Sequence, residues 1–198
     1  MSESISESSQ LSQLSEEQAL ALDLCESGEN IFLTGGAGSG KSYVIREFMK
    51  KKDHQQMPIL ASTGAAAVLL GGRTFHSFFG LGIMEGGAQA TLQRTLQNKN
   101  VMKRIKKVEG VIIDEISMTP GEALMVAELL SQEARGSKLP WGGLRIIAVG
   151  DFGQLPPVAK YGQKRDWCFL NEVWKRSGFQ VCELKLNQRI HNNEFLNV

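Results

Sequence analysis

Apolar residues along this chain gather in short continuous runs that alternate with stretches of helical periodicity. These runs lie at 30–33, 58–62, 108–114 and 144–149, and a further strand is expected near 180–184. Runs of this kind are typical of parallel strands that are buried on both faces. Helical patterns lie between or beside them, at 43–49, 63–70, 90–107, 120–134 and 167–176. The alternation predicts an α/β fold with a mainly parallel sheet and right-handed crossovers.

The ends of this pattern suggest where the folded domain begins. Residues 1–13 are rich in Ser and Glu, and we expect them to form a disordered tail. Ser15-Glu16-Glu17-Gln18 has the form of a capping box and predicts a helix start. The 198 residues suffice for one domain with a sizeable core. We therefore expect a single domain over 14–198, with a small glycine-flanked insertion near 80–100.

The segment that follows the first apolar run fits the phosphate-binding pattern G-x-x-x-x-G-K-[ST]. A strand before it and a helix after it are the context that this pattern needs, because backbone N–H groups can then surround a polyphosphate at a helix N-terminus. Lys41 is expected on the β- and γ-phosphates, and the Ser42 hydroxyl is expected to ligate Mg²⁺. A flexible Gly-Ser loop is the alternative. The nucleotide-binding residues expected here are Gly35, Gly36, Ala37, Gly38, Ser39, Gly40, Lys41, Ser42 and Tyr43.

Two further polar segments follow apolar runs. Asp114 and Glu115 come directly after one run, where ligands bind in open α/β sheets. We assign Asp114 to Mg²⁺ and Glu115 to deprotonation of the attacking water; the alternative is a pair of acids that favours a helix start. Gln154 follows another run and could contact a γ-phosphate. Its alternative is a polar turn stiffened by Pro156 and Pro157.

Composition says more about the cellular compartment of the protein than about its function. The net charge is +1, so a nucleic-acid site would have to be local. Three cysteines without metal-type spacing indicate reduced thiols and a cytoplasmic or nuclear protein. We find neither an apolar run of bilayer length nor the regions of a signal peptide, so we expect no membrane contact.

Taken together, these segments resemble the helicase family named for petite integration frequency, the PIF-one family. It belongs to the superfamily-one DNA helicases of the 5′-to-3′ type related to RecD. The resemblance implies a RecA-like fold with strand order 5-1-4-3-2, in which the strand before Gln154 lies between those before Lys41 and Asp114. The matching segments are LSEEQ at 14–18, FLTGGAGSGKS at 32–42, ASTGAAA at 61–67, GGRTFHSFFGLG at 71–82, VIIDEISM at 111–118, GGLRIIAVGDFGQLPPV at 142–158 and LKLNQRI at 184–190.

The resemblance also implies roles for two more residues. Gln18 is similar to a glutamine that reads adenine, although the capping box with Ser15 explains the same residue. Arg189 is similar to an arginine that reaches the γ-phosphate. Ile190 departs from the family, whose members commonly carry Gln there.

Contacts with DNA are expected from two residues. Thr63 offers a hydroxyl, and His76 offers a flat ring of the kind on which bases stack. The neighbouring rings Phe75, Phe78 and Phe79 could also stack, but their spacing favours the core. The basic run Lys103, Arg104, Lys106 and Lys107 could bind phosphates; we favour a solvated helix face.

The resemblance therefore predicts the ATP-binding motor domain of a DNA helicase that acts in DNA repair, recombination or telomere maintenance. Its ligands would be ATP, Mg²⁺ and single-stranded DNA or duplex junctions. Such a motor is expected to be monomeric and to need a second RecA-like domain, for which this chain has no further residues. We expect it alone to bind Mg-ATP but hydrolyse it slowly. The alternatives are a nucleotide-dependent DNA- or protein-binding module without motor activity and an ATPase unrelated to nucleic acid.

Overall fold

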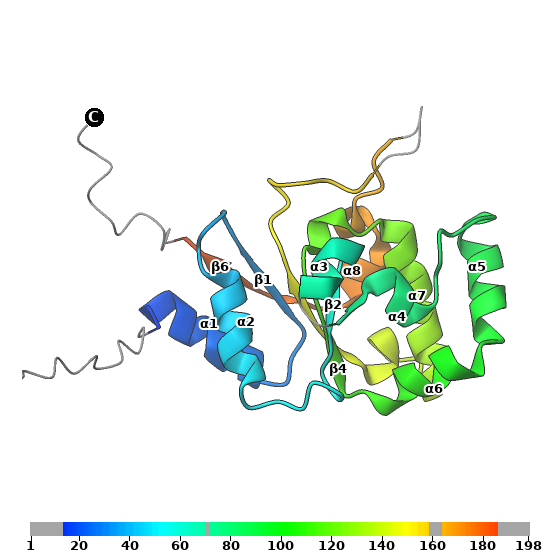
Figure 1. Ribbon diagram of the computed structural model, residues 1–198, viewed down its shortest axis with the longest axis horizontal. Coiled ribbons are helices and arrows are strands. Elements are labelled where there is room, and N and C mark those ends of the chain that lie inside the picture. The colour runs from blue at the N-terminus through cyan, green and yellow to red at the C-terminus, as the bar shows by residue number, and fades with distance from the viewer. Residues whose placement is uncertain (1–13, 70–71, 159–163, 186–198) are drawn as a thin grey trace, which may run out of the picture.

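The fold is described from a computed structural model, which covers residues 14–69, 72–158 and 164–185 of the chain. Its centre is a parallel sheet of six strands in the order β3-β2-β4-β5-β1-β6 (Figure 1). The α/β class and the parallel sheet predicted from the sequence are confirmed. The strands are β1 (Ile31–Gly35), β2 (Ile59–Ala61), β3 (Arg73–Thr74), β4 (Gly110–Ile113), β5 (Arg145–Val149) and β6 (Gln180–Leu184).

The expected strand order holds for five strands and is incomplete at one edge. The strands expected in the order 5-1-4-3-2 are β6, β1, β5, β4 and β2, and β5 lies between β1 and β4 as expected. A sixth strand, β3, pairs with β2 through the register Leu60↔Arg73. It has two residues, Arg73 and Thr74, and neither is apolar, so no hydrophobic run marked it.

Helices cover both faces of the sheet, and alternate strand residues face each layer. Ile31 and Leu33 pack with α1 (Glu16–Glu26) and α2 (Lys41–Met49), whereas Phe32 packs with the opposite layer. Figure 1 shows α1 and α2 on one side of the strands and α4 to α8 on the other. The remaining helices are α3 (Gly64–Leu69), α4 (Phe75–Phe79), α5 (Gly87–Leu96), α6 (Lys99–Lys107), η1 (Ile116–Met118), α7 (Gly121–Arg135), η2 (Pro140–Gly143), η3 (Cys168–Leu170) and α8 (Glu172–Arg176).

Two predicted helices are each divided in the structure. The helix expected over 90–107 is α5 followed by α6, and the Asn98 side chain caps α6 by accepting from the N–H groups of Asn100 and Val101. Asn favours an N-cap over a helix interior because its side chain replaces a backbone hydrogen bond. The helix expected over 167–176 is likewise η3 followed by α8, with Asn171 as the cap.

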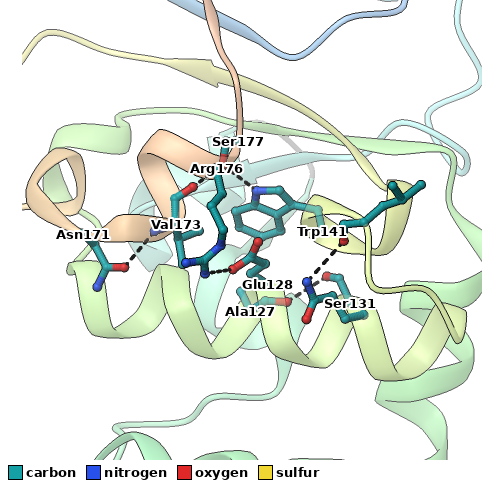
Figure 2. Close-up of polar contacts among 10 residues, drawn as sticks. Ala127, Glu128, Ser131, Trp141, Asn171, Val173, Arg176 and Ser177 are labelled. Carbon is teal, nitrogen blue, oxygen red and sulfur yellow. Dashed lines mark hydrogen bonds and ion pairs between the residues drawn. The ribbon is translucent and has the colours of Figure 1, made fainter.

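A buried polar junction fixes α8 to α7 and η2 (Figure 2). The Arg176 guanidinium pairs with Glu128 at 2.5 Å, and the Glu128 side chain is only 1% exposed. Trp141 Nε1 donates to Ser177 Oγ at 2.7 Å, and Ser177 Oγ donates to the Val173 carbonyl at 2.8 Å. Because β6 follows α8 directly and pairs with β1, this junction helps to position the strand that leads to the glycine loop.

Three further expectations concerned membrane-spanning segments, the cysteines and the N-terminal tail. Within the described ranges, we find no helix with the length and apolar character needed to cross a membrane. The three cysteines are not in disulfides. The tail predicted over 1–13 lies outside the described residues.

Candidate nucleotide-binding site

The glycine loop connects β1 to α2, as the motif requires. Gly40 precedes α2 in the left-handed conformation with φ of 94°, which glycine adopts at little cost. At Gly35, φ is 144°, and an added Cβ would lie 2.4 Å from the Leu184 carbonyl oxygen on β6. A side chain at Gly35 would therefore displace the loop from the neighbouring strand.

Lys41 is the first residue of α2, and its side chain reaches back over this loop. Its Nζ donates to the carbonyls of Gly35 at 2.6 Å and Gly36 at 3.1 Å. A cavity of about 410 Å³ opens beside the amine. Its lining joins the loop to the residues expected to act on the γ-phosphate: Ala37, Gly38, Gly40, Lys41, Ser42, Tyr43, Glu115 and Gln154.

The acid pair comes from the end of β4. Asp114 Oδ1 accepts from the Glu115 N–H at 3.0 Å, and Glu115 adopts the left-handed conformation with φ of 52°. Burial raises the pKa of Asp114, while that N–H and the charge of Lys41 oppose the rise. Burial also raises the pKa of Glu115, and the Asp114 charge adds to the rise. A glutamate with a raised pKa is a better proton acceptor, as a general base needs.

Ser42 and Asp114 provide oxygen atoms suited to a magnesium ion. Both side chains line a second cavity, of about 350 Å³, beside the apolar residues Ile45 and Ile112. A hydroxyl and a carboxylate are hard ligands of the kind Mg²⁺ prefers. The residues present therefore fit the ion, with Ser42 shared between this cavity and the one beside Lys41.

Asp151 is a site residue that sequence reasoning missed. Its carboxylate accepts from Gln154 Nε2 at 3.0 Å and from the Gly153 N–H at 2.8 Å. The Gln154 hydrogen bond is the main cause that lowers the pKa of Asp151. The signal was present, because Asp two residues before Gly is typical of a turn in which the side chain accepts from the backbone. Gln154 is thus part of a turn and also lines the cavity beside Lys41. Its contact with a γ-phosphate stays a prediction.

Two other residues implied by the resemblance have different outcomes. Gln18 is buried, and its side-chain oxygen accepts from the Ser15 N–H at 3.0 Å, which completes the capping box. No contact of Gln18 tests the adenine role, which stays a prediction. Arg189 lies outside the described residues.

The residues expected to contact DNA lie at the ends of β2 and β3. Thr63 is exposed, and its hydroxyl accepts from the Ala66 N–H at 3.3 Å. His76 is partly buried, and that burial lowers its pKa. The three neighbouring phenylalanines are in the core, as their spacing suggested: Phe75, Phe78 and Phe79.

The basic run at 103–107 forms the end of α6 and is not entirely a solvated face. Lys103, Lys106 and Lys107 are exposed as expected. Arg104 is different, because it donates to the carbonyls of Ser77 and Phe78 and lies over the Phe78 ring at 5.2 Å. It fixes the end of α4 against α6.

A family model and the relatives found by sequence comparison indicate the same family. The model of the PIF1-like helicase family matches residues 13–197. The ATP-dependent DNA helicase Pif1 of Bdellovibrio bacteriovorus is 72% identical over 186 residues, which are 94% of this chain and 42% of that protein. The human ATP-dependent DNA helicase PIF1 is 38% identical over 167 residues, which are 83% of this chain and 25% of that protein.

Comparison with solved structures gives the same family. The crystal structure of Pif1 helicase from Candida albicans matches with a TM-score of 0.81 and 36% identity, over 89% of this chain and 41% of that one. Pif1 helicase from Bacteroides in complex with ADP-AlF3 and ssDNA matches with a TM-score of 0.76 and 31% identity, over 94% of this chain and 45% of that one. The chain spans less than half the length of these relatives.

Proposed function

The chain belongs to the PIF1-like helicase family, and from this premise we propose that it is the ATP-binding motor domain of a 5′-to-3′ DNA helicase. The observation that carries the proposal is the meeting of Lys41, Glu115 and Gln154 around one cavity. They come from the ends of β1, β4 and β5, which are neighbours in the sheet. Ligands bind in open α/β sheets at this edge.

Each residue has a chemical task that its position allows. The loop N–H groups and Lys41 bind the phosphates of ATP at the N-terminus of α2, where the helix dipole favours anions. Glu115 orients a water and accepts its proton as that water attacks the γ-phosphate. Gln154, held by Asp151, contacts the γ-phosphate and responds to its loss. Ser42 and Asp114 would hold Mg²⁺, which neutralises charge on the phosphates when bound.

DNA is the proposed partner, by analogy with relatives. Pif1 helicase from Bacteroides is in complex with ADP-AlF3 and ssDNA in one similar structure, and another similar structure concerns DNA unwinding at forked dsDNA by two coordinating Pif1 helicases. We assign Thr63 and His76 to single-stranded DNA and duplex junctions, with Gln18 on the adenine and Arg189 on the γ-phosphate. Residues 14–198 form the first RecA-like domain in this proposal, with a small insertion near 80–100 that corresponds to α5.

Unwinding requires more than this domain. The proposed motor closes ATP between two RecA-like domains, and an arginine from a partner domain is worth about 10³–10⁵ in rate in related phosphoryl transfers. The 198-residue chain is therefore expected to bind nucleotide and to hydrolyse it slowly. In a longer protein that contains both domains, Glu115→Gln should preserve nucleotide binding and abolish hydrolysis.

The first test measures binding of a fluorescent ATP analogue and of labelled single-stranded DNA by anisotropy. Lys41→Ala should weaken nucleotide binding about 10- to 100-fold, because a charge-assisted contact is lost. Lys51→Ala is the control, since its side chain is 69% exposed. DNA binding should respond to the analogue in the wild type but not in Lys41→Ala. No binding of single-stranded DNA in either state would refute the helicase assignment, and equal nucleotide binding by both variants would refute the site.

A further inference from the structure

A basic cleft lies between α6 and the β2–β3 edge of the sheet, separate from the nucleotide cavity. Its volume is about 590 Å³. Four cationic side chains line it: Arg73, Lys103, Arg104 and Lys107. Among the described residues that line the cleft, none is Asp or Glu, and the nearby acids Asp53 and Glu109 line a different cavity.

The cations of this cleft are not balanced within the protein. In the part of the chain that the structure describes, the ion pairs involve other residues, and none includes Arg73, Lys103, Arg104 or Lys107. Burial lowers the pKa of Arg104, and the charge of Arg73, which lines the same cleft, lowers it further. An anion between them would relieve this repulsion.

The cleft is also arranged for a repeated anion. Lys103 and Lys107 are one helical turn apart, which separates them by about 6 Å along α6. Arg104 lines the same cleft and donates to the Ser77 and Phe78 carbonyls, so its position is fixed before any ligand arrives. A single phosphate would not engage all of these groups, whereas a phosphodiester backbone would.

The other polar side chains of the cleft add hydrogen-bond donors. His54, Gln55 and Asn100 bring N–H groups of the kind that contact phosphate and sugar oxygens. The lining aromatic ring, Phe78, is only 2% exposed. Single-strand sites present several aromatic faces to successive unpaired bases, whereas the exposed ring in this lining is the single imidazole of His54. The lining therefore suits a nucleic acid whose bases are already paired.

We propose that this cleft binds the phosphate backbone of duplex DNA, apart from the strand contacts assigned to Thr63 and His76. The inference rests on the proposed function, because it takes DNA as the substrate. It adds a second contact that would hold the duplex arm of a junction beside the motor domain. The contact is independent of base sequence, because only backbone groups are engaged.

The test measures binding of a blunt-ended, labelled DNA duplex to the 198-residue chain over a range of salt concentrations. The double variant Lys103→Glu/Lys107→Glu should weaken binding at least about 10-fold at low salt, and the slope of log K against log salt should become shallower by about 2. Lys99→Glu/Lys106→Glu is the matched control. It makes the same change of charge on the same helix, at exposed residues outside the cleft lining.

The outcomes separate this inference from the proposed function. It is supported if only the cleft variant loses duplex affinity while both variants keep nucleotide and single-strand binding. It is overturned if both double variants lose affinity equally, if the wild type binds no duplex, or if polyglutamate competes as well as DNA. If the wild type showed no nucleotide-dependent binding of single-stranded DNA, that result would instead refute the proposed function. Thermal melts of each variant show whether a loss of binding reflects unfolding.

Discussion

The backbone of Glu115 is strained, and replacing this residue should make the protein more stable. It is one of three non-glycine residues with positive φ among the described residues, at 52°. The left-handed conformation costs a residue with a Cβ about 1–2 kcal/mol. Its carboxylate accepts no hydrogen bond from the described residues, so the fold loses little when the side chain is removed. Strain of this kind persists at functional sites because function requires it.

The magnitude follows from comparing Glu115→Gly with Glu115→Gln. Both remove the charge, but Gln keeps the Cβ and the strain. Gly relieves the strain but lowers stability by about 0.5–1 kcal/mol, because glycine has greater freedom in the unfolded chain. From the midpoints of these ranges, Glu115→Gly should be more stable than Glu115→Gln by about 0.75 kcal/mol, or about 1.5–3 °C in Tm for a domain of this size.

The pH dependence gives a second measure of the same residue. Because the pKa of Glu115 is raised in the folded state, the folded protein holds that proton more tightly than the unfolded chain. The cost of the carboxylate is absent below its unfolded pKa, grows as the pH rises through the folded pKa, and stays at higher pH. Glu115→Gln should therefore gain more stability over the wild type at about pH 8 than at about pH 4.

Urea denaturation at both pH values measures these differences. Gln93→Gly, on the exposed face of α5, is the control and should lose about 1 kcal/mol, as glycine does in a helix. If Glu115→Gly were less stable than Glu115→Gln, the strain would not exist and the reasoning would be wrong. An advantage of Glu115→Gln that shrank as the pH rose would contradict the direction of the pKa shift.

Two further predictions concern packing around the site. An added Cβ at Gly150 would lie 3.1 Å from the backbone N of Ile116, so Gly150→Ala should cost about 1–3 kcal/mol of stability by separating β5 from the acid pair. Gly64→Ala is the control and should not destabilise the protein, because its Cβ would meet nothing within 4 Å. Equal melting temperatures for the two variants would contradict this prediction. Arg176→Ala should cost about 2–3 kcal/mol by leaving the buried Glu128 carboxylate unpaired, less than a fully buried pair because the Arg176 side chain is 49% exposed. Adding Glu128→Gln should recover part of that loss, and a double variant no better than the single one, measured by urea denaturation, would show that the charge is not the cause.

The sequence predicted the parts of the fold that depend on long apolar runs. The strands β4 and β5 were visible because both faces of β4, and of β5 after Arg145, are buried and carry no polar side chain. The strand β3 was not visible, because two residues at a sheet edge need no apolar side chains. The break between α5 and α6 was also missed, although Asn98 marked it, because the helical spacing continues across the break.

The candidate site was predictable where one motif gives both residue type and geometry. The glycine loop and the acid pair met as expected because carboxyl ends of neighbouring parallel strands lie at one edge. Asp151 was missed because its spacing to Gly153 indicates only a turn, and its contact with Gln154 depends on how the two side chains lie. The burial of Arg104 depends in the same way on α4, which is far from it in sequence.

The most direct measurement of the central claim is a crystal structure of the chain with ADP, Mg²⁺ and a mimic of the γ-phosphate. We expect the Lys41 amine to leave the carbonyls of Gly35 and Gly36 for a phosphate oxygen. Ser42 and Asp114 would face the metal, and Glu115 would lie beside the mimic. A nucleotide bound elsewhere, with Lys41 still on both carbonyls, would contradict the account.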